Sequence, residues 1–248
     1  MQKRIKLIKY GDVMDYTLRS ISGPLAYAFQ RVGISPNTVT LVRSCLMLVV
    51  MCLFAQGRVM TIVWGGILLQ VCDILDYVDG DLARLIDRPS KLGEWMEYVE
   101  NNFQGTTGSL LGFSLILGIF NATLNVQLWV LLFFLVFGVH MKKSLIVTSV
   151  KSDHWVFNIL ERSSFDQFQN TMETSLVYRI GRLFVWISTR DINLIFLASV
   201  FLPLSFASHG FLLLNSTLLL IAIAHNATWL GIAFFQLRHL CLSSGKAH

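Results

Sequence analysis

The chain has 248 residues, of which 54% are hydrophobic and 14% are charged, and its formal net charge at pH 7 is +5. A mean hydropathy of +0.60 is too high for a water-soluble domain of this length, so we expect an integral membrane protein that crosses the bilayer several times. The four cysteines lie in or beside apolar segments without the spacing of metal ligands, so no disulfide framework is expected.

The N-terminal segment mixes basic and apolar side chains. It lacks the long apolar core and the small-residue cleavage site of a signal peptide. Its basic residues are Lys3, Arg4, Lys6, Lys9 and Arg19. We expect residues 1–21 to form an amphipathic helix that lies on the membrane surface.

Six apolar segments follow, each close to the ~20 residues that cross the ~30 Å hydrocarbon core of a bilayer. They run near Val39–Ala55, Val59–Leu75, Trp95–Phe120, Val126–Met141, Ile192–Ala207 and Phe211–Phe235. Pro203 is expected to bend the fifth segment. The predicted fold is all-α: a polytopic membrane protein with six transmembrane helices after the surface helix. We expect a single domain over residues 1–248, with the helix bundle at residues 36–240.

Lysine and arginine are unevenly distributed between the two sets of predicted loops. The N-terminal segment, the link 87–91, the stretch 142–190 and the C-terminal tail hold nearly all of them, whereas the opposite loops carry only Arg58. By the positive-inside rule, the link and both termini should face the cytoplasm. Five basic residues suit either membrane anchors, which we favour, or a pocket for an acceptor phosphate: Lys142, Lys143, Arg179, Arg182 and Arg190.

Acidic side chains concentrate between the second and third segments, from Cys72 to Asn101. Charge at the mouth of a membrane helix is costly, which makes these carboxylates candidates for a functional site. Asp76 and Asp79 lie one helical turn apart and share a face, and Glu97 lies on a second acidic helix. This arrangement suits metal ions that are held against a phosphate.

The spacing within this stretch resembles the signature of the CDP-alcohol phosphotransferases, which reads Asp, Asp-Gly, Ala-Arg, Gly, Asp, Asp. The matching residues are Asp76, Asp79, Gly80, Ala83, Arg84, Gly93, Glu97 and Asn101. Upstream, Gly33 to Thr40 resembles the Pro-Asn-x-x-Thr element of that family, with Asn37 as its asparagine. A long motif at a fixed place in a matching membrane layout is a specific signal.

The resemblance implies transfer of a phospho-alcohol or phosphatidyl group from a CDP-linked donor, either CDP-diacylglycerol or a CDP-alcohol, to a hydroxyl acceptor with release of CMP. It implies Mg²⁺ or Mn²⁺ as cofactor, with the ligands Asp76, Asp79, Glu97 and Asn101. Arg84 is expected to bind the diphosphate. The nucleotide is expected to lie against Gly80, Ala83, Gly93, Asn37 and Thr40. Membrane lipid is the other partner, no nucleic acid is expected, and a homodimer is an expectation from the family alone.

Two motif positions depart from the family pattern. Glu97 replaces an Asp, which keeps the charge and lengthens the side chain by one methylene group. Asn101 stands where the family has the proposed general base, and an amide cannot accept a proton at neutral pH. Loss of a general base costs ~10²–10⁴-fold in rate. Three interpretations stay open: Glu100 or Glu97 is the base, the acceptor needs little help from a base, or the chain is a slow or inactive relative.

Other acidic residues in this stretch have a second interpretation, and so does the function of the chain. Asp73, Glu94 and Glu100 are as compatible with solvated helix caps as with a site, and Asp81 and Asp87, off the motif, are expected to be solvated. A non-catalytic membrane module that binds nucleotide or lipid is the main rival function, because of Asn101. A transporter is a weaker rival. Transporter ion sites tend to lie near the midplane of the membrane, whereas the acidic cluster of this chain is expected at one membrane face.

Overall fold

The computed structural model describes residues 13–86, 91–103, 107–151 and 176–244, and helices are the only regular secondary structure of these residues. Within these ranges the side chains of residues 13–15, 94, 97, 101–103, 147–151, 176–179, 182 and 235–244 are not described. The helices are α1 (Val13–Val32), α2 (Pro36–Ala55), α3 (Val59–Ile86), α4 (Lys91–Phe103), α5 (Leu110–Thr123), α6 (Gln127–Lys151), α9 (Leu176–Thr189), α10 (Asp191–Val200), α11 (Leu202–His209) and α12 (Leu212–Ser244).

Four helices in the described part of the chain are long and apolar enough to cross a membrane: α2, α3, Gln127–Ile146 of α6 and Leu212–Phe234 of α12. A fifth span is counted when Leu183–Thr189 and Asp191–Val200, which meet at 73°, are taken as one. α5 is apolar, but its 14 residues are fewer than a bilayer crossing needs. The prediction of an all-helical membrane protein is confirmed. The expected third and fifth segments are not continuous helices.

The residues just before α5, where the expected third segment breaks, make close contacts with α6 and α10. A Cβ atom built on Gly108 would lie 2.5 Å from the Cβ of Val139 in α6, so only glycine fits there. Thr107 donates hydrogen bonds from its backbone N and its Oγ1 to Oδ2 of Asp191, at 3.2 and 2.8 Å. The expected fifth segment breaks at Phe201, and Pro203 lies in the first turn of α11, where a proline is tolerated.

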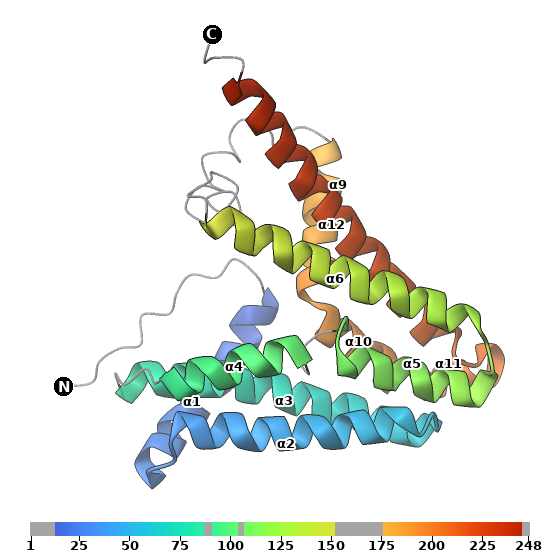
Figure 1. The fold of residues 1–248 in the computed structure, drawn as a ribbon. Coiled ribbons are helices and arrows are strands. Elements are labelled where there is room, and N and C mark those ends of the chain that lie inside the picture. Colours follow the sequence, from blue (N-terminus) through green and yellow to red (C-terminus); the bar gives the residue numbers. More distant parts are fainter. Residues whose placement is uncertain (1–12, 87–90, 104–106, 152–175, 245–248) are drawn as a thin grey trace.

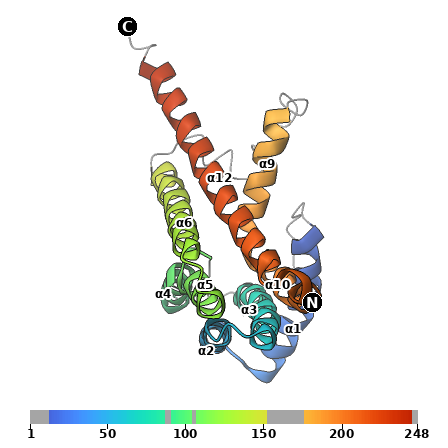
Figure 2. The ribbon, with the colours of Figure 1, turned by 90° about the vertical axis from the view of Figure 1, so that its right-hand side faces the viewer.

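The helices pack in two groups that meet where α10 contacts both α3 and α12 and where α5 contacts α6. α2 and α3 lie side by side, α1 packs on α3, and α5 packs on α2 (Figure 1). Figure 2 shows α6, α9 and α12 extending away from that group and diverging toward their far ends. The short loops after α2, α5 and α11 lie at the right-hand end of Figure 1, opposite the C-terminal end of α3.

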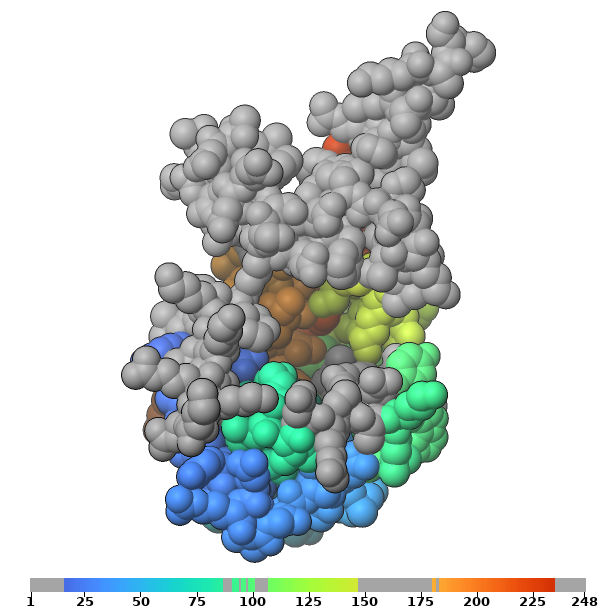
Figure 3. Space-filling model, turned by 90° about the vertical axis from the view of Figure 1, so that its left-hand side faces the viewer, coloured from blue at the N-terminus to red at the C-terminus, as the bar shows by residue number. Residues whose placement is uncertain are grey.

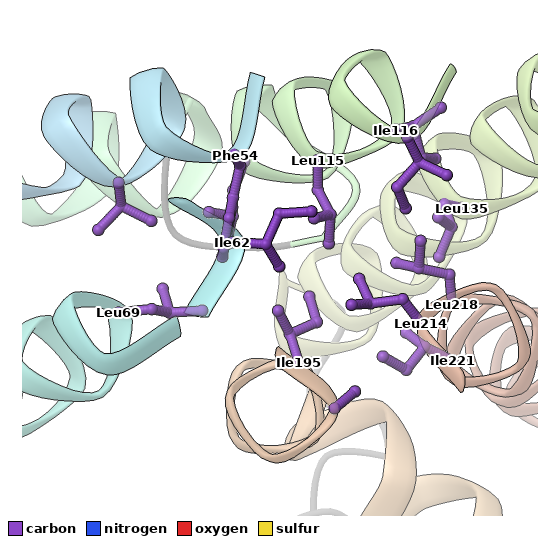
Figure 4. Close-up of a cluster of buried hydrophobic side chains, with 14 of the residues drawn as sticks. Phe54, Ile62, Leu69, Leu115, Ile116, Leu135, Ile195, Leu214, Leu218 and Ile221 are labelled. Atoms are coloured by element: carbon purple, nitrogen blue, oxygen red, sulfur yellow. The ribbon is translucent and has the colours of Figure 1, made fainter. Parts of the chain in front are cut away.

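The core lies where eight of the described helices meet, α2, α3, α5, α6, α9, α10, α11 and α12. Figure 4 labels ten of its buried side chains: Phe54, Ile62, Leu69, Leu115, Ile116, Leu135, Ile195, Leu214, Leu218 and Ile221. α2 and α5 touch through backbone atoms, because a Cβ on Gly118 would collide with the carbonyl oxygen of Phe54. Large apolar side chains such as Leu41, Phe133 and Leu219 are exposed on the outer faces. Such surfaces suit contact with lipid.

α1 differs from the predicted surface helix in its position along the chain. The described helix begins at Val13, and residues 1–12 lie outside the described part. Leu18, Ser22 and Ala26 share one face of α1 and are buried against α3. The end of α3 is therefore covered by a neighbouring helix, which has a direct effect on Asp81.

Asp81 is buried, with 3% of its surface exposed, so the prediction that it is solvated was wrong. Its Oδ2 accepts a hydrogen bond of 2.6 Å from Oγ of Ser22. Its Oδ1 accepts hydrogen bonds from Nη1 of Arg19 at 3.2 Å and from Nη2 of Arg84 at 2.7 Å. Asp81 is buried because α1 packs across α3. This packing could not be predicted from the residues around Asp81 in the sequence. One carboxylate thus connects two helices.

This contact predicts different effects for two serines of α1. Ser22→Ala should lower the free energy of unfolding by about 1–2 kcal/mol, because a buried carboxylate loses one of its donors. Ser20→Ala is the matched control, since Ser20 is exposed and its Oγ donates only to the carbonyl oxygen of Thr17 in its own turn. Thermal unfolding in detergent measures both. Equal stability of the two variants would contradict the role given to Asp81.

Candidate functional site

The turn between α1 and α2 brings the Pro-Asn-x-x-Thr element beside the motif helix α3. Gly33 ends α1 with φ of 78°, in the left-handed region that glycine adopts without strain. Ser35 caps α2 by accepting a hydrogen bond of 3.2 Å from the backbone N of Thr38, and Pro36 lies in the first turn. One turn later, Oγ1 of Thr40 donates a hydrogen bond of 2.8 Å to Oδ2 of Asp79. The local sequence thus places Thr40 against the motif.

Arg43, one turn beyond Thr40 in α2, lies at the centre of the acidic cluster and is only 4% exposed. Its Nε donates a hydrogen bond of 2.9 Å to Oε1 of Glu100, and its Nη2 donates to Oε2 of the same carboxylate. Its Nη1 forms an ion pair with Asp76 and lies 3.8 Å from Oδ2 of Asp79. A single guanidinium group from α2 therefore holds carboxylates of both α3 and α4.

A small pocket opens beside this guanidinium group. It is lined by Arg43, Met47, Cys72, Asp73, Asp76, Glu100 and Ile192. The side chain of Asp76 is 49% exposed and that of Asp79 is 17% exposed, whereas that of Glu100 is 4% exposed. Figure 3 shows the end of the molecule where α1, α2, α4 and the C-terminal part of α3 come together. The cluster is thus open at Asp76 and closed at Glu100.

The donor atoms of this cluster fit a hard divalent cation. Asp76 and Asp79 offer carboxylate oxygens from successive turns of α3, and such oxygens are the ligands that Mg²⁺ prefers. Oδ2 of Asp73, in the same pocket, is buried without a hydrogen-bond partner. Among the described side chains, no group of three or more His, Cys, Asp or Glu is arranged as a metal site. Glu97 and Asn101 belong to α4, but their side chains lie outside the description.

Arg84, the expected ligand of the diphosphate, lies beside Asp81 with its side chain 50% exposed. A Cβ built on Gly80 would lie 3.3 Å from Nη2 of Arg84, so the missing side chain of this glycine leaves room for the guanidinium group. Ala83 and Gly93 are partly buried at the same end of the molecule. The motif residues of α3 are therefore gathered in its last three turns. Asp87 and the side chain of Glu94 lie outside the description.

The basic residues near the end of α6 take part in a second buried polar group. Nζ of Lys142 donates a hydrogen bond of 2.8 Å to the carbonyl oxygen of Ser188, so this lysine connects α6 with α9. Asp191, 7% exposed, accepts hydrogen bonds from Thr107 and lies 3.7 Å from Nε2 of His225. Arg179 and Arg182 have no described side chains. Membrane anchors, and the alternative of a pocket for an acceptor phosphate, both stay predictions.

Arg43 was not predicted as a site residue, although the sequence contains a signal for it. An arginine inside an apolar membrane segment needs a partner, and such a residue marks a functional site by default. Arg43 also follows Thr40 by three residues, so both lie on one face of the helix. Glu100 was predicted as a candidate base, but its partner Arg43 was not predicted, because the sequence does not show that α4 packs on α2.

Comparison with known proteins identifies the family. The family model for CDP-alcohol phosphatidyltransferase matches residues 33–158, just over half of the chain. The matched region includes the Pro-Asn-x-x-Thr element, both motif helices and α6. No curated protein matches the chain. The chain belongs to the CDP-alcohol phosphatidyltransferase family, whose members are membrane transferases that generally depend on a divalent metal.

Proposed function

We propose that this protein transfers a phospho-alcohol or phosphatidyl group from a CDP-linked donor to a hydroxyl acceptor and releases CMP. One observation carries the proposal: Thr40 and Arg43 of α2, Asp76 and Asp79 of α3, and Glu100 of α4 form one connected cluster, and three of them, Arg43, Asp76 and Glu100, line the pocket. Membership of the family supports the reaction class and the CDP-linked donor. The acceptor is proposed only as an alcohol.

In the proposed site the carboxylates of α3 bind the cofactor, Mg²⁺ or Mn²⁺, together with Glu97 and Asn101 of α4. When bound, the metal neutralises the diphosphate and stabilises the attacking and leaving oxygens. The hydrogen bond from Thr40 keeps the carboxylate of Asp79 in one orientation. Arg84 supplies a half-exposed guanidinium group for the diphosphate oxygens. These residues bind and orient the donor.

In the proposed reaction the acceptor oxygen attacks the β-phosphorus of the donor, and the bond from that phosphorus to the bridging oxygen breaks as CMP leaves. The hydroxyl proton must pass to a base of the chain. Asn101 cannot accept it. Both oxygens of Glu100 already accept hydrogen bonds from Arg43. We therefore assign the proton to Glu97, which lies one helical turn before Asn101.

Asn101 also favours a second candidate function, in which the protein binds a CDP-linked lipid without turnover. The pocket and the carboxylates of α3 would serve equally well for binding. The two functions differ in whether CMP is released.

We also propose that the motif end faces the cytoplasm, where CDP-linked donors are made. A cysteine at Lys91, in a variant without the natural cysteines, should react with an impermeant maleimide only after the cytoplasmic face is opened. A cysteine at Asn125, in the loop at the opposite end, is the matched control and should react in intact cells. Both positions are exposed. The reverse pattern of labelling would contradict this orientation.

The transferase activity itself is tested with the purified protein, CDP-diacylglycerol or a CDP-alcohol, and a set of hydroxyl acceptors. CMP release should require Mg²⁺ or Mn²⁺, and the mass of the lipid product should identify the acceptor. Asp79→Ala should lower the rate by about 10²-fold or more, because a metal ligand is lost. Asn125→Ala, at the far end of the molecule, should keep the rate. Metal-independent CMP release, or an undiminished rate in Asp79→Ala, would refute the proposed site.

The position of the base gives a separate prediction. Because Glu97 is the proposed base, Glu97→Gln should lower the rate of CMP release at neutral pH by ~10²–10⁴-fold. Asn101→Asp should leave the rate unchanged or lower it, because it crowds a like charge into a site that already has a base; a higher rate would contradict the assignment to Glu97. Asn102→Asp adds the same charge about 100° further around the helix and should leave the rate unchanged. If none of the variants releases CMP, the binding module is the better description.

A further inference from the structure

Arg43 places a fixed positive charge where the proposed site would bind a metal ion. Its Nη1 contacts Asp76 and lies 3.8 Å from Asp79, which are the two carboxylates of α3 that the cofactor would need. Its other two nitrogens are held by Glu100. The guanidinium group reaches Asp76 from the interior of the protein, since the side chain of Arg43 is only 5% exposed. The side chain of Asp76 is 49% exposed, so its carboxylate remains open to the pocket.

We propose that the ion pair between Arg43 and Glu100 sets the affinity of Asp76 and Asp79 for a divalent cation. Nη1 of Arg43 is a competitor, built into the protein, for the same carboxylate oxygens. Glu100 draws the guanidinium group toward α4 and neutralises its charge, which reduces that competition. The inference rests on the proposed function for the identity of the metal ligands, and it assigns Glu100 a role in metal affinity in place of proton transfer.

Electrostatics gives opposite signs for the two members of the pair. Removal of the Arg43 charge leaves Asp76 and Asp79 without a competing cation, so metal should bind more tightly. Removal of the Glu100 charge leaves the full charge of Arg43 directed at these carboxylates, so metal should bind more weakly. At these distances inside a protein, each change is on the order of 10-fold to 100-fold in affinity. A merely structural role would weaken binding in both variants.

The test measures binding of Mn²⁺ alone by electron paramagnetic resonance, with the full-length protein in detergent and no donor present. Arg43→Gln should bind Mn²⁺ at least about 10-fold more tightly than the unmodified protein, and Glu100→Gln should bind it at least about 10-fold more weakly. Arg58→Gln removes an equal charge from an exposed loop residue at the opposite end and should change nothing. The double variant Arg43→Gln, Glu100→Gln should bind Mn²⁺ within about 3-fold of the unmodified protein.

Arg43→Gln leaves a buried carboxylate unpaired and can fail to fold, because breaking a buried pair is strongly destabilising. Glu100→Gln and the double variant then decide the question. The inference would be overturned if Glu100→Gln bound Mn²⁺ with the same affinity as the double variant or as the unmodified protein. A folded Arg43→Gln variant that binds Mn²⁺ no more tightly than the unmodified protein would also overturn it. The expected order of affinities without any CMP release would leave the inference standing and refute the transferase function. Metal-dependent CMP release without the expected order of Mn²⁺ affinities would support the transferase function and refute the inference.

Discussion

The buried charge of Arg43 is the constraint on which the site depends. A guanidinium group inside an apolar membrane helix must be paired, because leaving it unpaired in a low-dielectric surrounding is very costly. Glu100 supplies the partner from α4, and Asp76 and Asp79 supply further negative charge from α3. Pairing therefore requires α4 to lie against α2 and the acidic face of α3 to turn toward both helices. The same contacts that satisfy Arg43 assemble the acidic pocket.

Two other buried carboxylates join helices in the same manner. Asp81 connects α1 to α3 through Ser22 and Arg19, and Asp191 connects α10 to the turn before α5 through Thr107. Apolar contacts specify the position of membrane helices weakly, because lipid tails are as apolar as the side chains. Polar contacts between helices have defined directions, so they can fix how one helix is placed against another. The breaks before α5 and before α10 occur beside Asp191, where such contacts accumulate.

The sequence predicted those features that depend on short spacings along the chain. Asp76, Asp79, Gly80 and Arg84 follow one another within three helical turns, so their position at one end of α3 could be inferred directly. The membrane character and all-helical fold followed from composition and apolar length. The partner of Arg43 and the burial of Asp81 could not be inferred, because both depend on which helices pack together. The break in the third segment was missed because it depends on contacts of Thr107 with Asp191 of α10 and of Gly108 with Val139 of α6. In the fifth segment a bend at Pro203 was predicted, and the helix breaks two residues earlier, at Phe201.

Each polar residue near the pocket has a distinct role in the proposed site. Thr40 orients Asp79, Arg43 carries the internal positive charge, and Glu100 balances that charge. In the proposed mechanism the departure at Asn101 leaves proton transfer to Glu97, while the residues proposed to hold the donor are kept.

The most direct measurement is anomalous diffraction at the manganese edge from crystals of the protein grown with Mn²⁺ and CDP. The account predicts an anomalous peak in contact with the carboxylates of Asp76 and Asp79, with the guanidinium group of Arg43 still bound to Glu100 by two hydrogen bonds. A peak located elsewhere, or Asp76 and Asp79 bound only to Arg43 when Mn²⁺ and CDP are saturating, would contradict it.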